Sequence, residues 1–160
     1  MRKKRIMVIG PTNCGKTSLV NSLNDYDGPL RKTQDIIYVK NTIDTPGSYI
    51  ENAWMYKHLI ATAQDASHVL ILIDQSRCAS VYSPGFAKVF KCPVIGVITK
   101  IDLMAENENL CIQQLKEIGV PKPYFKISIA SGIGIEALKE YLFTFEKKVK
   151  GDLDEIYNRK

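Results

Sequence analysis

Short apolar runs alternate with longer amphipathic stretches along this chain, and the apolar runs predict strands. They lie at residues 5–9, 36–39, 41–43, 69–73, 94–98 and 124–127. Three of them are continuously apolar, which is typical of strands that are covered on both faces of a sheet. The second and third runs follow one another closely, so we expect a hairpin and one antiparallel edge strand.

Apolar residues recur at helical spacing between these runs. One such stretch covers residues 135–149, another lies near residues 53–64, and a third ends at Gly119. A fourth follows the first strand, with Leu19 and Leu23 on one face. Strands that alternate with helices predict an α/β fold with a doubly wound, mostly parallel sheet and helices on both of its faces.

The turn after the first strand carries the pattern G-x-x-x-x-G-K-[ST]. It reads Gly10, Pro11, Thr12, Asn13, Cys14, Gly15, Lys16 and Thr17, and Ser18 follows. Such a turn points backbone N–H groups toward a phosphate at the positive end of a helix. We expect Lys16 to reach the β- and γ-phosphates of a nucleotide and the Thr17 hydroxyl to bind Mg²⁺.

A second pattern, D-x-x-G, follows the third strand as Asp44-Thr45-Pro46-Gly47. We expect the Asp44 carboxylate to hold Mg²⁺ through water and the Gly47 N–H to meet the γ-phosphate. An ordinary turn is the alternative interpretation. The turn at residues 10–17, the phosphate loop, precedes this segment and argues against that alternative.

A third pattern, [NT]-K-x-D, follows the strand at residues 94–98 and includes Thr99, Lys100 and Asp102. The Asp102 carboxylate is placed to accept hydrogen bonds from N1 and N2 of guanine. Adenine lacks that donor pair, so it would leave the carboxylate unpaired. We expect the stem of Lys100 to cover the base. Thr99 stands where Asn is commoner, which predicts a weaker tie to the phosphate loop.

The last strand is followed by Ser128, Ile129 and Ala130. They match an S-A-x loop that closes over guanine O6 through a backbone N–H. Ile129 stands where Ala is usual, and a backbone contact survives that change. The motif is weak alone and gains weight from the three patterns before it.

Composition and charge describe an ordinary globular chain, with 45% hydrophobic and 24% charged residues among 160. The net charge of +5 is spread along the chain and is weak evidence for a nucleic-acid partner. No apolar run approaches the roughly 20 residues that span a bilayer. We therefore expect a cytoplasmic protein with neither nucleic acid nor a membrane as a partner. One domain is expected over residues 1–150, with a charged tail at residues 151–160.

The four cysteines, Cys14, Cys78, Cys92 and Cys111, show neither C-x-x-C spacing nor a nearby histidine. We interpret them as reduced thiols rather than a disulfide framework or a zinc site. Cys14 precedes a helix N-terminus, a position that lowers the pKa of a thiol. A small residue that fits the loop is the simpler interpretation of Cys14.

In this order and at these separations, the four motifs resemble those of the small Ras-like GTPases, and the resemblance covers essentially the whole chain. It implies a three-layer P-loop NTPase fold, GTP and GDP as ligands and Mg²⁺ as a cofactor. It also implies that Thr33 belongs to a mobile first switch, which closes on Mg²⁺ and the γ-phosphate. Thr33 would then act in catalysis with Lys16 and Gly47. A plain surface loop is the alternative for Thr33.

Segments between the motifs carry a more specific resemblance. Residues 32–34, 43–52 and 56–59 resemble the EutP/PduV family of small GTPase-like proteins of ethanolamine and propanediol utilisation, and residues 82–86 and 92–96 lean toward the propanediol branch. The resemblance implies an association with a bacterial microcompartment, a protein shell around a pathway with a toxic aldehyde intermediate. A shell protein would then be a partner. The oligomeric state has no signal in the sequence.

Two residues depart from the Ras-like pattern. Ser48 follows Gly47, where Ras-type enzymes have a Gln that orients the attacking water, so we expect slow hydrolysis. Asn13 resembles the asparagine of potassium-activated bacterial GTPases, which helps to seat a monovalent cation between the phosphates. This resemblance predicts K⁺-stimulated hydrolysis, because a cation there stabilises the charge that develops in the transition state.

The sequence thus predicts a guanine-nucleotide-binding protein with Mg²⁺-dependent, slow GTP hydrolysis, acting as a switch or accessory protein of a microcompartment. Two alternatives stay open. The loop could instead transfer the γ-phosphoryl of ATP or GTP to a small carboxylate such as acetate, although we see no sequence element for an acceptor lid. The protein could also bind nucleotide only for stability and dock on a shell, which Ser48 favours.

Overall fold

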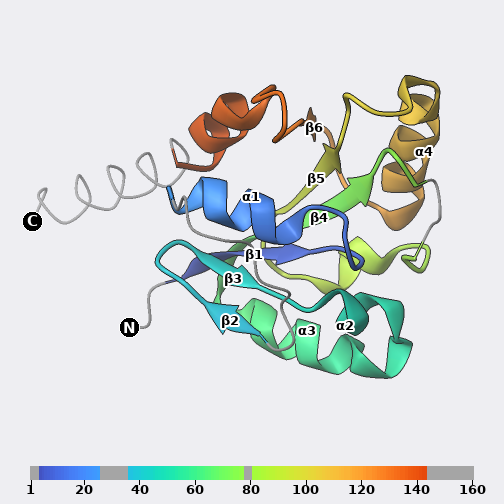
Figure 1. Cartoon of the computed structure of the whole chain (residues 1–160). Helices are drawn as coiled ribbons and strands as arrows, with labels where there is room; N and C mark the ends of the chain where they lie inside the picture. Colours follow the sequence, from blue (N-terminus) through green and yellow to red (C-terminus); the bar gives the residue numbers. More distant parts are fainter. Residues whose placement is uncertain (1–3, 26–35, 78–80, 144–160) are drawn as a thin grey trace, which may run out of the picture.

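The computed structural model of the protein describes residues 4–25, 36–77 and 81–143. A six-stranded sheet with the order β2-β3-β1-β4-β5-β6 forms its centre (Figure 1). The strands are β1 (Arg5–Ile9), β2 (Ile37–Tyr38), β3 (Thr42–Asp44), β4 (Ala66–Asp74), β5 (Val94–Thr99) and β6 (Tyr124–Lys126). β2 pairs antiparallel with β3, and the other neighbouring strands pair parallel. The predicted mostly parallel sheet with one antiparallel edge strand is confirmed.

Helices cover both faces of the sheet. They are α1 (Lys16–Leu23), α2 (Gly47–Glu51), α3 (Tyr56–Thr62), α4 (Glu108–Ile118) and a helix at residues 135–143. Single 3₁₀ turns lie at Ala53–Met55, Ala63–Asp65, Phe86–Val89 and Ala105–Asn107. Within the described residues, no helix is long and apolar enough to cross a membrane.

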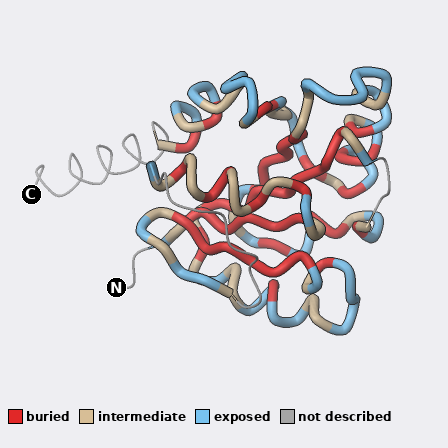
Figure 2. Tube along the Cα trace, viewed as in Figure 1, coloured by how far each residue is buried: buried red, intermediate tan, exposed pale blue. Residues whose placement is uncertain are grey.

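The side chains of β1 alternate between two cores, as the period of a strand requires. Met7 and Ile9 belong to the core beneath α2, α3 and α4, whereas Ile6 and Val8 belong to the core beneath α1 and residues 135–143. All four are fully buried. The sheet is therefore the middle of three layers, and its strands form the buried centre of the molecule (Figure 2).

The parallel strands bring their carboxyl ends to one edge of the sheet. The register places Val8 beside Asp44 and Asp74 beside Thr99. The loops that follow β1, β3, β4 and β5 therefore lie next to each other. In open α/β sheets this edge is where ligands bind.

Several boundaries differ from the sequence-based expectation. β4 begins at Ala66 rather than at residue 69. The polar residues Ser67 and His68 hide the start of this strand in the sequence, although His68 is buried. The helix expected near residues 53–64 is α3 flanked by 3₁₀ turns. Only 135–143 of the helix predicted for residues 135–149 lies in the described part of the chain, and the tail at residues 151–160 lies outside it.

The short helix α2 was not expected at all. It begins directly after Pro46, whose φ of −64° suits the entry to a helix. From the sequence, Pro46-Gly47 reads as a turn with no regular structure beyond it. Ile50 fixes α2 to the core, because only 1% of its surface is exposed. The segment that begins at Gly47 is thus helical in this structure.

Candidate nucleotide site

The phosphate loop connects β1 to α1 and is folded tightly on itself. Asn13 and Gly15 both have a positive φ, of 65° and 100°. A Cβ atom on Gly10 would lie 2.6 Å from Cys14 Sγ, so this position requires glycine. The backbone of the loop therefore turns sharply before the start of α1, and the N-terminus of a helix after such a turn suits an anion such as phosphate.

Lys16 is the first residue of α1, and its side chain returns along the loop. Its Nζ atom donates a hydrogen bond to the carbonyl of Pro11 at 2.8 Å, and only 6% of the residue is exposed. A buried ammonium needs an anionic partner or several acceptors. Its position inside the loop suits a terminal phosphate of a nucleotide.

Thr17 and Asp44 meet across the junction of α1 and β3. Thr17 Oγ1 lies 3.5 Å from Asp44 Oδ2, and Asp44 is buried with 3% of its surface exposed. A hydroxyl and a carboxylate are hard oxygen donors, which Mg²⁺ prefers together with water and phosphate oxygens. The residues present therefore fit the predicted Mg²⁺ ion.

Gly47 lies against the phosphate loop. A Cβ atom on Gly47 would lie 2.3 Å from Thr12 N, so no larger residue fits without movement of α2 or the loop. The turn before it is fixed by Thr45, whose hydroxyl donates to the carbonyl of Val8 at 2.7 Å. The D-x-x-G segment and the phosphate loop thus form one surface.

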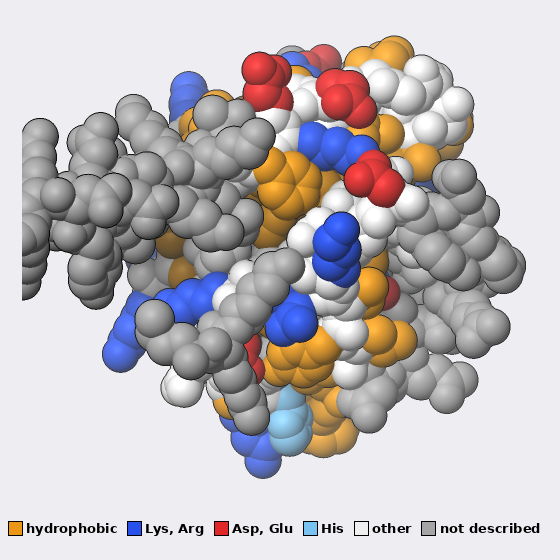
Figure 3. Space-filling model, turned by 90° about the vertical axis from the view of Figure 1, so that its left-hand side faces the viewer, with side chains coloured by type: hydrophobic (Ala, Val, Ile, Leu, Met, Phe, Trp, Pro, Cys, Tyr) orange, Lys and Arg blue, Asp and Glu red, His pale blue; other side chains and the backbone are white. Residues whose placement is uncertain are grey.

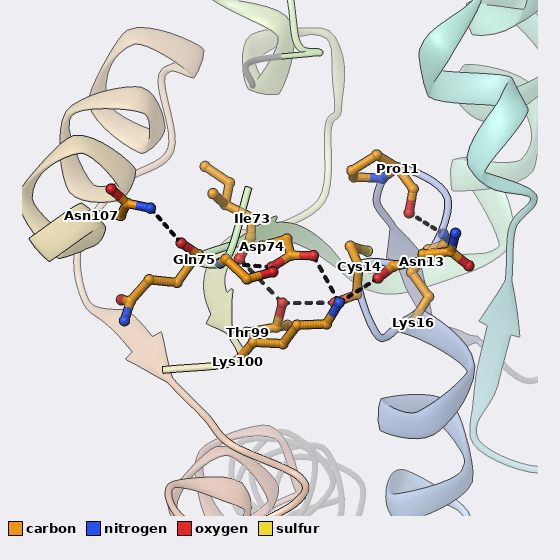
Figure 4. A network of polar contacts seen from close by, with 11 residues as sticks. Pro11, Asn13, Cys14, Lys16, Ile73, Asp74, Gln75, Thr99, Lys100 and Asn107 are labelled. Carbon is orange, nitrogen blue, oxygen red and sulfur yellow. Dashed lines mark hydrogen bonds and ion pairs between the residues drawn. The ribbon is translucent and has the colours of Figure 1, made fainter. Parts of the chain in front are cut away.

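The end of β5 is tied to the phosphate loop by two side chains (Figure 4). The Thr99 hydroxyl donates to the carbonyl of Cys14 at 2.7 Å, and Lys100 Nζ donates to the carbonyl of Asn13 at 2.7 Å. The short Thr99 side chain thus reaches the loop. The expectation that this tie is weaker than one made by asparagine stays a prediction. Lys100 also has a positive φ of 56°, which directs its stem over the loop.

Asp102 follows in the same loop and is oriented by the segment after β6. Its Oδ1 atom accepts a hydrogen bond from the Ser128 hydroxyl at 2.8 Å, and Ser128 is fully buried. The carboxylate itself is exposed. Ser128 therefore fixes the direction of a carboxylate whose other oxygen faces a ligand or solvent.

A pocket of about 380 Å³ lies between these loops. Its lining contains the predicted residues Cys14, Gly15, Ser18, Thr99, Lys100, Asp102, Ile129 and Ala130. Leu103 and Ile127 add apolar walls. A largely apolar pocket with one carboxylate in its lining suits a nucleobase with a pair of N–H donors.

The structure thus gathers the predicted residues of all four motifs at one edge of the sheet. Ser128 does not line the pocket and instead holds Asp102. Thr33 lies outside the described residues, so its role as a switch residue stays a prediction.

Sequence reasoning missed a buried acidic residue, Asp74, at the end of β4. Its Oδ2 atom forms an ion pair with Lys100 Nζ at 2.9 Å, and its Oδ1 atom accepts hydrogen bonds from the N–H and hydroxyl of Ser76. Next to it, Gln75 Nε2 donates to the carbonyls of Ile101 and Leu103, which braces the loop around Asp102. The available signal was a carboxylate directly after an apolar strand.

Cys14 has the opposite chemistry from the one that its place before a helix predicts. Burial raises the pKa of its thiol to about 11, although Lys16 opposes the shift. The dipole of a helix acts most strongly on an accessible thiolate, and Cys14 is only 1% exposed. The interpretation as a small residue that fits the loop agrees with this burial. Within the described residues, no cluster of side chains could hold a metal through His, Cys, Asp and Glu alone.

Solved structures share this fold. A bacterial selenocysteine-specific elongation factor (EF-Sec) matches with a TM-score of 0.68 and 24% identity, over 92% of this chain and 29% of that one. A probable GTP-binding protein engB matches with a TM-score of 0.65 and 20% identity, over 90% of this chain and 99% of that one. The fold is therefore the α/β fold of P-loop GTPases.

Sequence relatives are more specific. The propanediol utilization protein PduV of Citrobacter freundii is 36% identical over 140 residues, which cover 87% of this chain and 93% of that protein. A protein named "Probable acetate kinase EutP" from Escherichia coli K12 is 29% identical over 147 residues, or 91% of this chain and 92% of that protein. The PduV-EutP family, described as "Ethanolamine utilisation - propanediol utilisation", matches residues 3–144. The chain belongs to the PduV-EutP family, as the segments between its motifs predicted.

Proposed function

We propose that this protein binds guanine nucleotides with Mg²⁺ and hydrolyses GTP slowly. The observation that carries the proposal is the continuity of the site. The loop with Lys16, the Thr17–Asp44 pair and the pocket that Asp102 helps to line lie along one edge of the sheet. A nucleotide with its phosphates on the loop would place its base in that pocket.

Base selection in this proposal depends on Asp102. The carboxylate would accept hydrogen bonds from N1 and N2 of guanine, while the Ser128 hydroxyl holds its Oδ1 atom at 2.8 Å. Hydrogen bonds to a charged acceptor are the stronger kind, and a wrong base leaves that acceptor unpaired. The Lys100 stem and Ile129 would cover the two faces of the ring.

Catalysis in this proposal is positioning and charge neutralisation. Lys16 would neutralise the terminal phosphate, and the Gly47 N–H would donate to it while water attacks the γ-phosphorus. Thr17 and Asp44 would hold Mg²⁺, which when bound neutralises charge on the β- and γ-phosphates. Ser48 is exposed in the first turn of α2 and is too short to position water as a glutamine does. This is why we propose a slow rate.

A change of base preference tests the proposal. We would compare GDP, ADP and xanthosine diphosphate on the wild type and on Asp102→Asn, with Mg²⁺ present. An asparagine amide can donate to O2 of xanthine, where guanine has a donor. We expect the variant to lose roughly 100-fold in GDP affinity, as two charge-assisted hydrogen bonds predict, and to gain affinity for the xanthine nucleotide.

The control is Asp65→Asn, which removes a carboxylate just before β4, at the opposite end of the strands from the site. It should leave all three affinities unchanged. Equal GDP binding by the wild type and Asp102→Asn would overturn the base assignment. It would also favour the hypothesis that the protein transfers a phosphoryl group to a small carboxylate.

The second candidate function is phosphoryl transfer to a small carboxylate. A second pocket, of about 160 Å³, lies beside the loop and includes Thr12, Arg77 and Gln114 in its lining. An arginine next to the γ-phosphate end could hold a carboxylate such as acetate, whose oxygen would attack the γ-phosphorus and release the diphosphate. A EutP relative carries the name "Probable acetate kinase". In this structure, the pocket beside the loop is the observation that favours phosphoryl transfer.

Trapping with hydroxylamine separates the two activities, because an acyl phosphate forms a hydroxamate and inorganic phosphate does not. Acetate-dependent hydroxamate that falls in Arg77→Gln would establish the kinase. Phosphate release that is independent of acetate would leave the GTPase reading in first place. Turnover below the buffer background with intact binding would support a nucleotide-stabilised scaffold.

Family membership supports a place for this activity in propanediol or ethanolamine utilisation. We propose that the protein is a cytoplasmic switch or accessory protein that associates with a microcompartment shell. Purified shell proteins should bind this protein more tightly in one of its two states, with GDP or with a GTP analogue, than in the other. Equal binding of the GDP and GTP-analogue states would contradict a switch.

A further inference from the structure

An unexpected contact joins α2 to the phosphate loop. Glu51 is the last residue of α2, and its Oε1 atom accepts a hydrogen bond from the Thr12 N–H at 2.8 Å. The two residues are 39 positions apart in the chain. The preceding residue, Ile50, is buried in the core and fixes the helix, so α2 presents the Glu51 carboxylate to the loop.

The contact lies at the end of the loop where a terminal phosphate would bind. Thr12 N is the same atom that Gly47 approaches, since a Cβ atom on Gly47 would lie 2.3 Å from it. Gly47 is the residue whose N–H is expected to meet the γ-phosphate. Lys16 Nζ is bound to the neighbouring carbonyl of Pro11. Glu51 therefore brings a negative charge to the γ-phosphate end of the site.

We propose that Glu51 sets the preference of this site between diphosphate and triphosphate nucleotides. The inference rests on the proposed nucleotide site. A γ-phosphate and the Glu51 carboxylate are both anions and compete for the Thr12 N–H. A triphosphate must therefore displace Glu51, whereas a diphosphate ends closer to Lys16 and the N-terminus of α1. The carboxylate selects against the triphosphate by charge and by occupation of a donor.

The displaced carboxylate has a cation within reach. Arg77 lines the same pocket of about 160 Å³ as Thr12 and Glu51. Figure 3 shows a different side of the molecule, the left-hand side of Figure 1, where Lys and Arg side chains are scattered among apolar and acidic ones in the described part. A move toward Arg77 would carry the end of α2 away from Thr12. Triphosphate binding would in this way be reported to the surface beyond α2.

That surface holds a natural reporter. Trp54 is the single tryptophan of the chain, lies three residues after Glu51, and is 71% exposed. Displacement of Glu51 would change the surroundings of this indole ring. Its fluorescence therefore reports the position of α2 independently of affinity.

Equilibrium binding to Glu51→Gln tests the proposal on the full chain with Mg²⁺. Gln keeps an acceptor oxygen and removes the charge. We expect the affinity for a non-hydrolysable GTP analogue to rise about tenfold, or ~1.4 kcal/mol, while GDP affinity stays within about twofold. Such a change is modest because Glu51 is exposed and its charge is screened. Wild-type Trp54 fluorescence should change with the analogue and not with GDP.

Glu140→Gln is the matched control, because it removes one exposed carboxylate from the helix at residues 135–143. It should change neither affinity. An equal effect of Glu51→Gln on both nucleotides, or none on either, would overturn the inference while leaving the proposed site intact. The adenine pair, ADP and a non-hydrolysable ATP analogue, is measured in parallel, since the contact acts on phosphate and not on the base. If neither pair binds the wild type, both the proposed function and this inference fail.

Discussion

The ion pair between Lys100 and Asp74 gives a prediction that can be worked through from the structure. Lys100 Nζ lies 2.9 Å from Asp74 Oδ2 and 2.7 Å from the carbonyl of Asn13. The Asp74 side chain is 4% exposed, and that of Lys100 is 34% exposed. Replacing Lys100 by Met removes the charge and keeps most of the stem.

The loss of stability expected for Lys100→Met lies between two limits. Breaking a fully buried pair costs about 3–5 kcal/mol, and an exposed pair is worth about 0–1 kcal/mol. Asp74 keeps its two hydrogen bonds from Ser76, and Lys100 is partly screened by solvent, so we expect Lys100→Met to cost about 2 kcal/mol. With a urea slope of ~2 kcal/mol/M, the unfolding midpoint should fall by ~1 M.

A double-mutant cycle in urea isolates the pair itself. Lys100→Met, Asp74→Asn and the double variant should give a coupling of about 1–1.5 kcal/mol. The reference is the pair Lys139–Glu136, whose atoms lie 4.0 Å apart and whose Glu side chain is 90% exposed. Its coupling should be below ~0.5 kcal/mol. A coupling near zero for Lys100–Asp74 would refute the idea that this pair ties β4 to the loop.

Three further predictions follow from the site. Gly47→Ala places a Cβ atom 2.3 Å from Thr12 N, so it should weaken binding of a GTP analogue by at least tenfold in a fluorescence titration; an affinity equal to that of the wild type would show that α2 moves freely. Because burial raises the pKa of the Cys14 thiol to about 11 from 9.0, its contribution to stability is present below pH 9 and should decline between pH 9 and 11; urea midpoints for the wild type and Cys14→Ala that run parallel over this interval would contradict it. If Asn13 helps to seat a monovalent cation, GTP hydrolysis should be faster in K⁺ than in Na⁺, and Asn13→Ala should abolish the difference; equal wild-type rates in the two salts would remove the hypothesis.

The sequence was sufficient for the site residues that lie in local patterns. The phosphate loop, Asp44, Gly47 and Asp102 each follow an apolar strand. A parallel sheet brings the ends of such strands together without any further information. The same reasoning extends to Thr99, but it does not show whether the Thr99 hydroxyl reaches the carbonyl of Cys14. That reach depends on how closely the two loops pack, which no local pattern encodes.

The features that were missed are contacts between segments far apart in the chain. Nothing in the local sequence indicates that Glu51 contacts Thr12, because a five-residue helix after Pro46 has too few residues for a periodic pattern. Asp74 reads as the solvated end of a strand until Lys100 is placed beside it. In both cases the function of a charge is decided by a tertiary partner rather than by its neighbours in sequence.

The central claim is that one edge of the sheet is a guanine-nucleotide site. Competition between GDP and ADP for the wild-type protein, with Mg²⁺ and fluorescently labelled GDP as the probe, tests it most directly. The account predicts that unlabelled GDP displaces the probe at a concentration at least 100-fold lower than ADP, because only guanine pairs with Asp102. Equal displacement by the two nucleotides, or stronger displacement by ADP, would contradict it.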